Sequence, residues 1–155
     1  MAWMVVRVRG SVHSKHEIGE TLRFLHLSRP NHATVVPEEA SFRGMLTKVQ
    51  GYITWGEADE ATVGLLLAAR GRTPEGKPLA PPSSSGGAGT PPAADVSALA
   101  HSVLTDGLPR VAAVRPLFRL RAPKGGWRST KKPFALGGAL GYRGAAINDL
   151  VRKMM

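Results

Sequence analysis

The sequence predicts an α+β fold in which strands and helices alternate, β-α-β-α-β, within the first 57 residues. Two observations carry this prediction. Short segments with period-two alternation indicate strands, and apolar side chains spaced three and four residues apart indicate amphipathic helices between them. Because each helix has one apolar stripe to bury, both helices need a sheet beside them, and the expected architecture is a two-layer α+β sandwich.

The three predicted strands are short. The first covers residues 4–9, and its alternation separates two kinds of side chain. The apolar face has Met4, Val6 and Val8, and the opposite face has Val5, Arg7 and Arg9. One buried face and one basic face would suit a sheet that lies on RNA. Residues 31–36, ended by Pro37, and residues 52–55 predict the second and third strands.

Capping and breaking residues delimit the two predicted helices. Ser14 and Glu17 form a capping box, in which each side chain satisfies a free backbone amide at the other end of the box, and this helix ends before Pro30. Glu38 and Glu39 favour the start of the second helix electrostatically, and Gly51 closes it. The apolar stripes consist of Ile18, Leu22 and Leu25 in the first helix and of Phe42, Met45, Leu46 and Val49 in the second.

The remaining chain divides into three segments. Residues 58–71 predict a helix, and residues 72–94 form a Pro/Gly/Ser-rich linker. A linker of this composition buries little apolar surface, so we expect few buried contacts from it and no requirement for it in folding of the core. Residues 95–155 form an extension with a short helix capped by Asp95, an alternating segment at 116–121, a Gly-rich basic loop and a closing helix.

The charge of the chain indicates a polyanionic partner. The 155 residues include 21 Lys and Arg against 11 Asp and Glu, a net charge of +10. Nucleic acid is the commonest partner of this kind, and an acidic membrane surface is the second. No apolar run approaches the roughly 20 residues of a membrane-spanning helix, and the N-terminal apolar run is too short for a signal peptide. With no cysteine, the chain has no disulfide, zinc finger or thiol catalysis, and we expect it in the cytoplasm.

The positive charge is concentrated in the extension. Residues 107–148 include no acid but nine Lys or Arg. Residues 124–132 interleave cations with glycines and Trp127, a composition typical of nucleic-acid surfaces. Glycines allow close approach to phosphates, cations neutralise them, and an indole stacks on an unpaired base. The alternatives are a solvated loop and, for Trp127, a cap on the protein's own core. We expect the loop from Lys124 to Arg143 to be mobile until RNA binds.

No catalytic or metal-binding pattern is present in the sequence. It lacks the GxxxxGK[ST] phosphate loop, its five histidines lack metal-ligand spacing, and its acids are too scattered for a catalytic pair. We therefore predict no enzymatic activity, no metal and no cofactor.

Several blocks in a fixed order carry a family resemblance. They are NHATVVP at 31–37, FRGM at 42–45, Lys48-Val49 and Trp55-Gly56-Glu57. These blocks resemble the family of large-subunit ribosomal protein thirty, whose eukaryotic counterpart is numbered seven. The short bacterial members match only to about residue 57. RLRAPKGG at 119–126, Gly137-Gly138 and Gly141 resemble the long archaeal members. Residues 72–94 depart from the archaeal pattern, which is often acidic or partly helical there.

The resemblance implies a three-stranded antiparallel sheet with two helices on one face, a relative of the ferredoxin-like fold. It also implies binding to large-subunit ribosomal RNA on the cytoplasmic ribosome, with no catalysis, cofactor or small-molecule substrate, and it allows neighbouring ribosomal proteins as partners. The open alternatives are a free-standing RNA chaperone or a subunit of a non-ribosomal ribonucleoprotein. An enzyme acting on RNA would need clustered acids beside the basic patch, which has none.

The expected RNA-binding residues combine basic side chains with a few polar and aromatic ones. They are Arg7, Arg9, Lys15, His16, Arg29, Asn31, His32, Arg43, Lys48, Arg119, Arg121, Lys124, Trp127, Arg128, Lys131, Lys132 and Arg143. Structural alternatives stay open for some positions. Asn31 and His32 could merely shape the turn before the second strand, and Gly44, beside Arg43, could serve only close helix–sheet packing.

Overall fold

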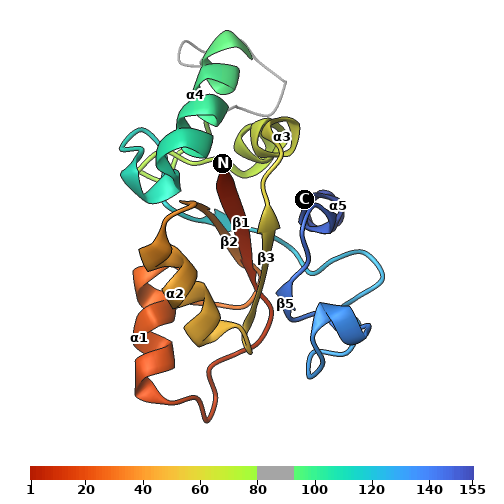
Figure 1. Cartoon of the computed structure of the whole chain (residues 1–155). Coiled ribbons are helices and arrows are strands. Elements are labelled where there is room, and N and C mark those ends of the chain that lie inside the picture. Colours follow the sequence, from red (N-terminus) through yellow and green to blue (C-terminus); the bar gives the residue numbers. More distant parts are fainter. Residues whose placement is uncertain (80–92) are drawn as a thin grey trace.

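The computed structural model describes residues 1–79 and 93–155, and its centre is a mixed sheet with helices on both faces (Figure 1). The described residues form five strands in the order β4-β2-β1-β3-β5. The strands are β1 Ala2–Arg7, β2 His32–Pro37, β3 Ile53–Glu57, β4 Phe118–Arg119 and β5 Gly141–Tyr142.

The three central strands confirm the predicted antiparallel arrangement. Met4 of β1 lies opposite Val35 of β2 on one side and opposite Gly56 of β3 on the other. The extension then adds two short edge strands, β4 antiparallel to β2 and β5 parallel to β3. The three-stranded description is therefore incomplete. β4 lies within the alternating segment predicted at 116–121, whereas β5 consists of two residues, too few to show the alternation that reveals a strand in a sequence.

The first helical layer agrees with the predicted stripes. Helices α1 (His16–Phe24) and α2 (Ala40–Val49) cover the sheet face that bears Val5. The side chains of Leu22, Leu25, Leu46 and Val49 are buried in this layer. The predicted capping box is wrong. Ser14 Oγ donates to the carbonyl of Ser11 at 2.7 Å, and the helix starts after Lys15 without a side-chain cap.

A second helical layer, supplied by residues after 57, covers the opposite face of the sheet, so the predicted two-layer sandwich describes residues 1–57 and is incomplete for the described chain. Helices α3 (Glu60–Arg70), α4 (Ala93–Asp106) and α5 (Ala146–Met154) pack with Met4 and Val6 in one apolar cluster. The signal for double burial is in β2, an almost continuous apolar run whose six residues are all buried. Helix α4 begins two residues before Asp95, so Asp95 is not its cap.

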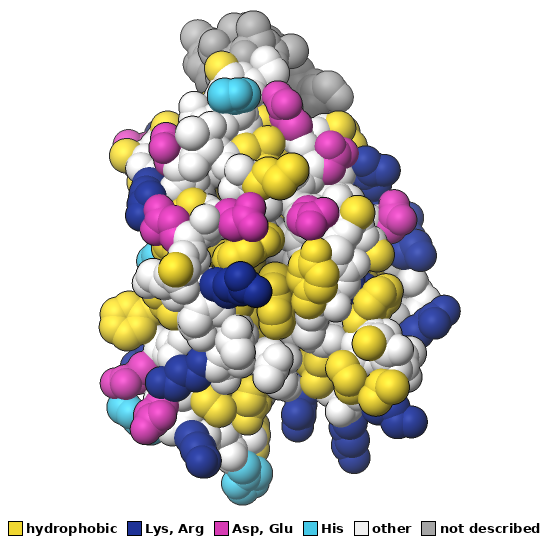
Figure 2. All heavy atoms as spheres, viewed as in Figure 1, with side chains coloured by type: hydrophobic (Ala, Val, Ile, Leu, Met, Phe, Trp, Pro, Cys, Tyr) yellow, Lys and Arg dark blue, Asp and Glu magenta, His cyan; other side chains and the backbone are white. Residues whose placement is uncertain are grey.

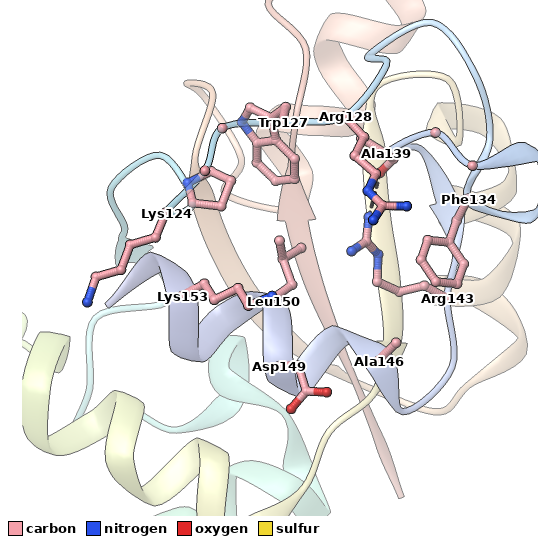
Figure 3. A pocket seen from close by; sticks show the side chains of 15 residues that line it. Lys124, Trp127, Arg128, Phe134, Ala139, Arg143, Ala146, Asp149, Leu150 and Lys153 are labelled. Atoms are coloured by element: carbon pink, nitrogen blue, oxygen red, sulfur yellow. Dashed lines mark hydrogen bonds between the residues drawn. The ribbon is translucent and has the colours of Figure 1, made fainter.

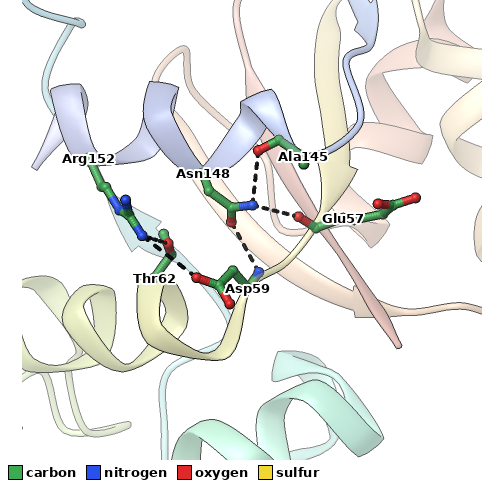
Figure 4. Close-up of polar contacts among 6 residues, drawn as sticks. All are labelled: Glu57, Asp59, Thr62, Ala145, Asn148 and Arg152. Atoms are coloured by element: carbon green, nitrogen blue, oxygen red, sulfur yellow. Dashed lines mark hydrogen bonds and ion pairs between the residues drawn. The ribbon is translucent and has the colours of Figure 1, made fainter.

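Helix α5 is fastened to the joint between β3 and α3 by Asn148 (Figure 4). Its side-chain oxygen accepts from the backbone amide of Asp59 at 3.1 Å, and its side-chain nitrogen donates to the carbonyls of Glu57 and Ala145, both at 3.0 Å. Arg152, one turn further along α5, donates to the Thr62 hydroxyl at 3.1 Å. These bonds fix the helix that closes the chain onto the sheet.

The segment predicted as a linker packs onto the core in its first part. Between residues 72 and 79 the chain forms a turn in which the Thr73 amide donates to the Lys77 carbonyl. Arg72 and Pro78 pair in an isolated antiparallel β-bridge. Leu79 is 8% exposed and belongs to the apolar cluster under α3. Leu79 is the only buried residue between 72 and 79, which agrees with the expectation of few buried contacts there, and residues 80–92 lie outside the described part of the chain.

Replacing Asn148 with alanine should destabilise the protein by about 1–3 kcal/mol, because it leaves the Asp59 amide and two carbonyls without these partners. Chemical denaturation of the free chain measures this loss. Asp149→Ala, an exposed neighbour on the same helix, is the matched control and should shift stability by less than about 0.5 kcal/mol. Equal effects of the two substitutions would contradict the assigned role of Asn148.

Candidate nucleic-acid interface

Arginines gather around His32 where β2 begins. Arg29 and Arg119 are exposed, Arg115 is half-buried, and the pairing of β2 with β4 sets His32 opposite Arg119. His32 itself is 8% exposed, and its burial is the main cause of its lowered pKa. The positive charges of Arg119, Arg29, Arg7 and Arg115 lower the pKa of His32 further. We call Arg7, Arg29, Arg115 and Arg119 the arginine cluster.

No carboxylate neutralises the arginine cluster. The ion pairs found within residues 1–79 and 93–155 join His16 to Glu20, Lys48 to Glu17, Lys77 to Glu75, Arg110 to Glu39 and Arg152 to Asp59. None includes a member of the cluster. In Figure 2 most of the acidic side chains lie in the upper half of the view, with a few at its lower left, while many Lys and Arg side chains lie along its lower and right margins. The cluster therefore attracts anions from outside the protein.

A second basic region is a groove between the basic loop and α5 (Figure 3). It encloses about 540 Å³. Four cationic and two aromatic side chains line it: Lys124, Arg128, Arg143, Lys153, Trp127 and Phe134. Gly125, Gly126, Gly137 and Gly138 also border it, and Asp149 is its one acid among the described residues. We call it the loop–α5 groove.

The basic loop has a structure of its own, contrary to the prediction that it is mobile until RNA binds. The Ala139 amide donates to the carbonyls of Ser129 and Lys132 at 3.0 and 3.1 Å. A side chain at Gly138 would collide with the backbone oxygen of Lys132, so the loop can close only with glycine there. The amide of Arg143 donates to the Trp55 carbonyl at 2.9 Å, next to the pairing of β5 with β3.

Arg143 holds the loop together and is not a free cation. Its Nε donates to Thr54 Oγ1 at 2.8 Å, and its Nη2 donates to the Ala139 carbonyl at 3.0 Å. Its guanidinium carbon lies 4.7 Å from the centre of the Phe134 ring, a cation–π contact. Burial lowers the pKa of this guanidinium. Its predicted role as an RNA contact is therefore secondary to a structural one.

Trp127 packs partly against the protein's own core. The half-buried indole contacts two apolar clusters, the large one beneath α3–α5 and a small one made by Val8, Ala139 and Leu140. Its Nε1 donates to Asn31 Oδ1 at 3.3 Å. The alternative in which Trp127 caps the core thus describes its placement, and stacking on RNA stays a prediction for the part of the ring left in the groove.

Comparisons with known proteins decide the family. A model of the family "Ribosomal protein L30p/L7e" matches residues 3–53. Proteins named "Large ribosomal subunit protein uL30" match the whole chain. That of Methanococcus vannielii is 42% identical over 158 residues and 100% of both chains. That of Methanosphaera stadtmanae is 40% identical over 99% of both, and that of Methanopyrus kandleri is 38% identical over 96% of this chain and all of its own. The chain belongs to the L30p/L7e family.

The family membership confirms the resemblance that the sequence blocks carry. The family model ends at residue 53, near the end of the predicted β-α-β-α-β core, while the archaeal relatives cover the extension as well. The family's Phe42-Arg43-Gly44-Met45 block lies on α2, where Arg43 and Gly44 are both exposed. No atom lies within 4 Å of the position a Gly44 Cβ would take, so the packing explanation for Gly44 is wrong.

Three residues expected to bind RNA are instead enclosed at the end of the sheet. Arg7 is 2% exposed beneath the α1–α2 layer, so the predicted basic sheet face does not exist. His32 is buried as well. Asn31 adopts a φ of 64°, its side-chain oxygen accepts a hydrogen bond from Trp127, and its carbonyl accepts one from the Leu120 amide. Asn31 therefore shapes the turn before the second strand, which was the structural alternative for this residue.

The other predicted residues are exposed. Arg9, whose guanidinium lies 5.4 Å from the Tyr52 ring centre, Lys15 and His16 at the start of α1, and Arg43 and Lys48 on α2 lie outside the loop–α5 groove. Arg121, Lys131 and Lys132 are exposed next to or within the loop. Sequence reasoning missed Arg115 and Lys153 as members of the two basic regions, since only folding brings them there.

Two further classes of site find no support in the described residues. Within 1–79 and 93–155, no helix is long and apolar enough to cross a membrane. Nor do three His, Asp or Glu side chains of these ranges come together as metal ligands would.

Replacing Trp127 with alanine should destabilise the free protein by about 1–3 kcal/mol, less than the roughly 3–5 kcal/mol of a fully buried tryptophan, because the indole is only half-buried. Thermal unfolding should show a loss of several degrees. Trp127→Phe retains part of the packing and should lose less, and Arg128→Ala, an exposed neighbour, should lose almost nothing. An unchanged thermal midpoint for Trp127→Ala would contradict the packing of the indole against the core.

Proposed function

We propose that this chain is a structural component of the large ribosomal subunit, where it binds and stabilises large-subunit ribosomal RNA in the cytoplasm. Relatives that match its whole length are named as large-subunit proteins. The observation that supports RNA binding most directly is the arginine cluster, whose four positive charges all act on His32 and which takes part in no ion pair of the described residues. Phosphates of RNA would supply the missing negative charge.

The two basic regions suggest a division of labour. Arg29 and Arg119 of the arginine cluster present exposed guanidinium groups that would neutralise a phosphate backbone and fix its position. The loop–α5 groove adds Lys124 and Arg128 around a partly exposed indole, an arrangement that suits an unpaired base with its phosphate. Contacts of this kind position RNA and require no chemical step.

The test of the ribosomal role is co-sedimentation. We expect the full-length chain to sediment with large subunits of its own cells and to stay on them after a high-salt wash, because an integral component is held by many contacts at once. Release by moderate salt, with the chain distributed over other RNAs, would favour a free-standing RNA chaperone and count against this function.

The electrostatic part of binding should appear in its salt dependence. For the isolated chain and a large-subunit RNA fragment, log K should fall with log[salt] with a slope of several units. The double variant Arg29→Gln, Arg119→Gln should reduce this slope by about two, one for each lost phosphate contact. Arg110→Gln is the control, because Arg110 is an exposed arginine that Glu39 already holds at 2.6 Å. A slope that falls equally in the control would contradict the assignment.

A further inference from the structure

Another basic hollow, apart from the loop–α5 groove, lies between the end of β1 and the start of α1. It encloses about 290 Å³. Arg7 borders it from the strand, and Lys15 and Arg23 border it from the helix. We call it the α1 hollow. None of the residues that line the loop–α5 groove lines this hollow, so the two are separate sites.

Arg7 is a buried cation whose hydrogen bonds are incomplete. Its Nε donates to the Arg9 carbonyl at 2.8 Å, and its Nη1 donates to the Leu27 carbonyl at 2.7 Å. Its Nη2 is buried and has no partner among the described residues, and the residue is only 2% exposed. No ion pair of residues 1–79 and 93–155 includes it. A buried charge without a counter-charge is costly, and an anion beside Nη2 would offset that cost.

The start of α1 is open in the same place. Ser14 could cap the helix, but its hydroxyl donates to the Ser11 carbonyl, and Lys15 at the N-cap makes no side-chain hydrogen bond to the helix. The first turn of this nine-residue helix therefore keeps backbone amides without a side-chain acceptor in the described structure. These amides and the positive end of the helix dipole attract anions.

The charges around the α1 hollow are positive in sum. The hollow is lined by three cations, Arg7, Lys15 and Arg23, and, among the described residues, by one carboxylate, Glu20. Glu20 Oε1 lies 3.6 Å from His16 Nδ1. The hydroxyls of Ser11, Ser14 and Ser28 also line the space. A guanidinium, an ammonium, free helix amides and hydroxyls together are donors that a phosphate oxygen accepts well.

We propose that the α1 hollow binds one phosphate group, with Arg7 Nη2 and the first amides of α1 as its donors and with Lys15 and Arg23 at its rim. The source of the phosphate group rests on the proposed function, because an RNA-binding chain would bind a backbone phosphodiester of the RNA in this hollow. Free inorganic phosphate offers the same chemistry, so the experiment separates the two sources.

The first arm uses inorganic phosphate and the full-length protein. Tens of millimolar sodium phosphate should raise the thermal midpoint by about 2–4 °C above sodium chloride of equal ionic strength. Arg7→Met keeps an unbranched apolar stem but removes the charge, and it should abolish this difference. Arg110→Gln, which changes an exposed arginine outside the hollow, should keep it. If Arg7→Met does not fold, the double variant Lys15→Gln, Arg23→Gln, which changes only exposed side chains, replaces it and should at least halve the difference.

The second arm uses a large-subunit RNA fragment. If the phosphate belongs to RNA, Arg7→Met, or the double variant in its place, should weaken binding about tenfold and reduce the salt slope by about one, while Arg110→Gln keeps the wild-type slope. A phosphate effect on the midpoint without a change in RNA affinity would support the site with free phosphate as its ligand.

Two outcomes would overturn the site. One is no phosphate-specific shift in the wild type together with unchanged RNA affinity of the Arg7 variant. The other is an equal loss in Arg110→Gln, which would make the effect one of net charge. If the wild-type chain bound no RNA at all, the proposed function would fail, and the phosphate arm alone would still decide whether the α1 hollow is a site.

Discussion

The burial of β1 on both faces is the constraint on which the rest of the structure depends. Met4, Val5 and Val6 are fully buried although they point alternately to opposite sides of the sheet. β1 also pairs with a strand along each edge. A β-α-β-α-β unit with helices on one face would leave Met4, Val6 and Val35 in water. The free-energy cost is about 25 cal/mol for each Å² of apolar surface exposed. The extension is therefore the cover of the second face and an integral part of the fold.

This cover also decides where the charge can lie. Because helices occupy both faces of the sheet, no basic sheet face is left, and exposed cations lie on the helix surfaces, at the edge strand β4 and in the loop that leads to β5. Arg29 and Arg119 share the end where β2 begins, and their charge is, after burial, a cause of the lowered pKa of His32. The basic loop is in turn fixed by Arg143 and Trp127, so its remaining cations stand on a rigid support.

The sequence predicts what local patterns encode and misses what distant contacts decide. The apolar stripes of α1 and α2 are correct because their period lies within a few residues. The burial of Arg7 was missed because alternation separates two faces of a strand without saying which one is covered. The composition of residues 107–148 locates the basic segment. It cannot tell that Arg143 is bonded to Thr54, 89 residues earlier, while Arg128 stays exposed.

The places where local rules fail are themselves close together at one end of the sheet. Ser14 does not cap its helix, Arg7 is buried without an anion, and Asn31 adopts a φ of 64°. The Asn31 amide donates to the Arg7 carbonyl at 2.8 Å, and its side chain holds Trp127, so the turn at Asn31 connects β1 to the basic loop. Local conflicts of this kind are expected where a sequence serves binding as well as folding. Arg7 borders the α1 hollow, and its positive charge is also among the causes that lower the pKa of His32, so this one buried side chain is common to the hollow and the arginine cluster.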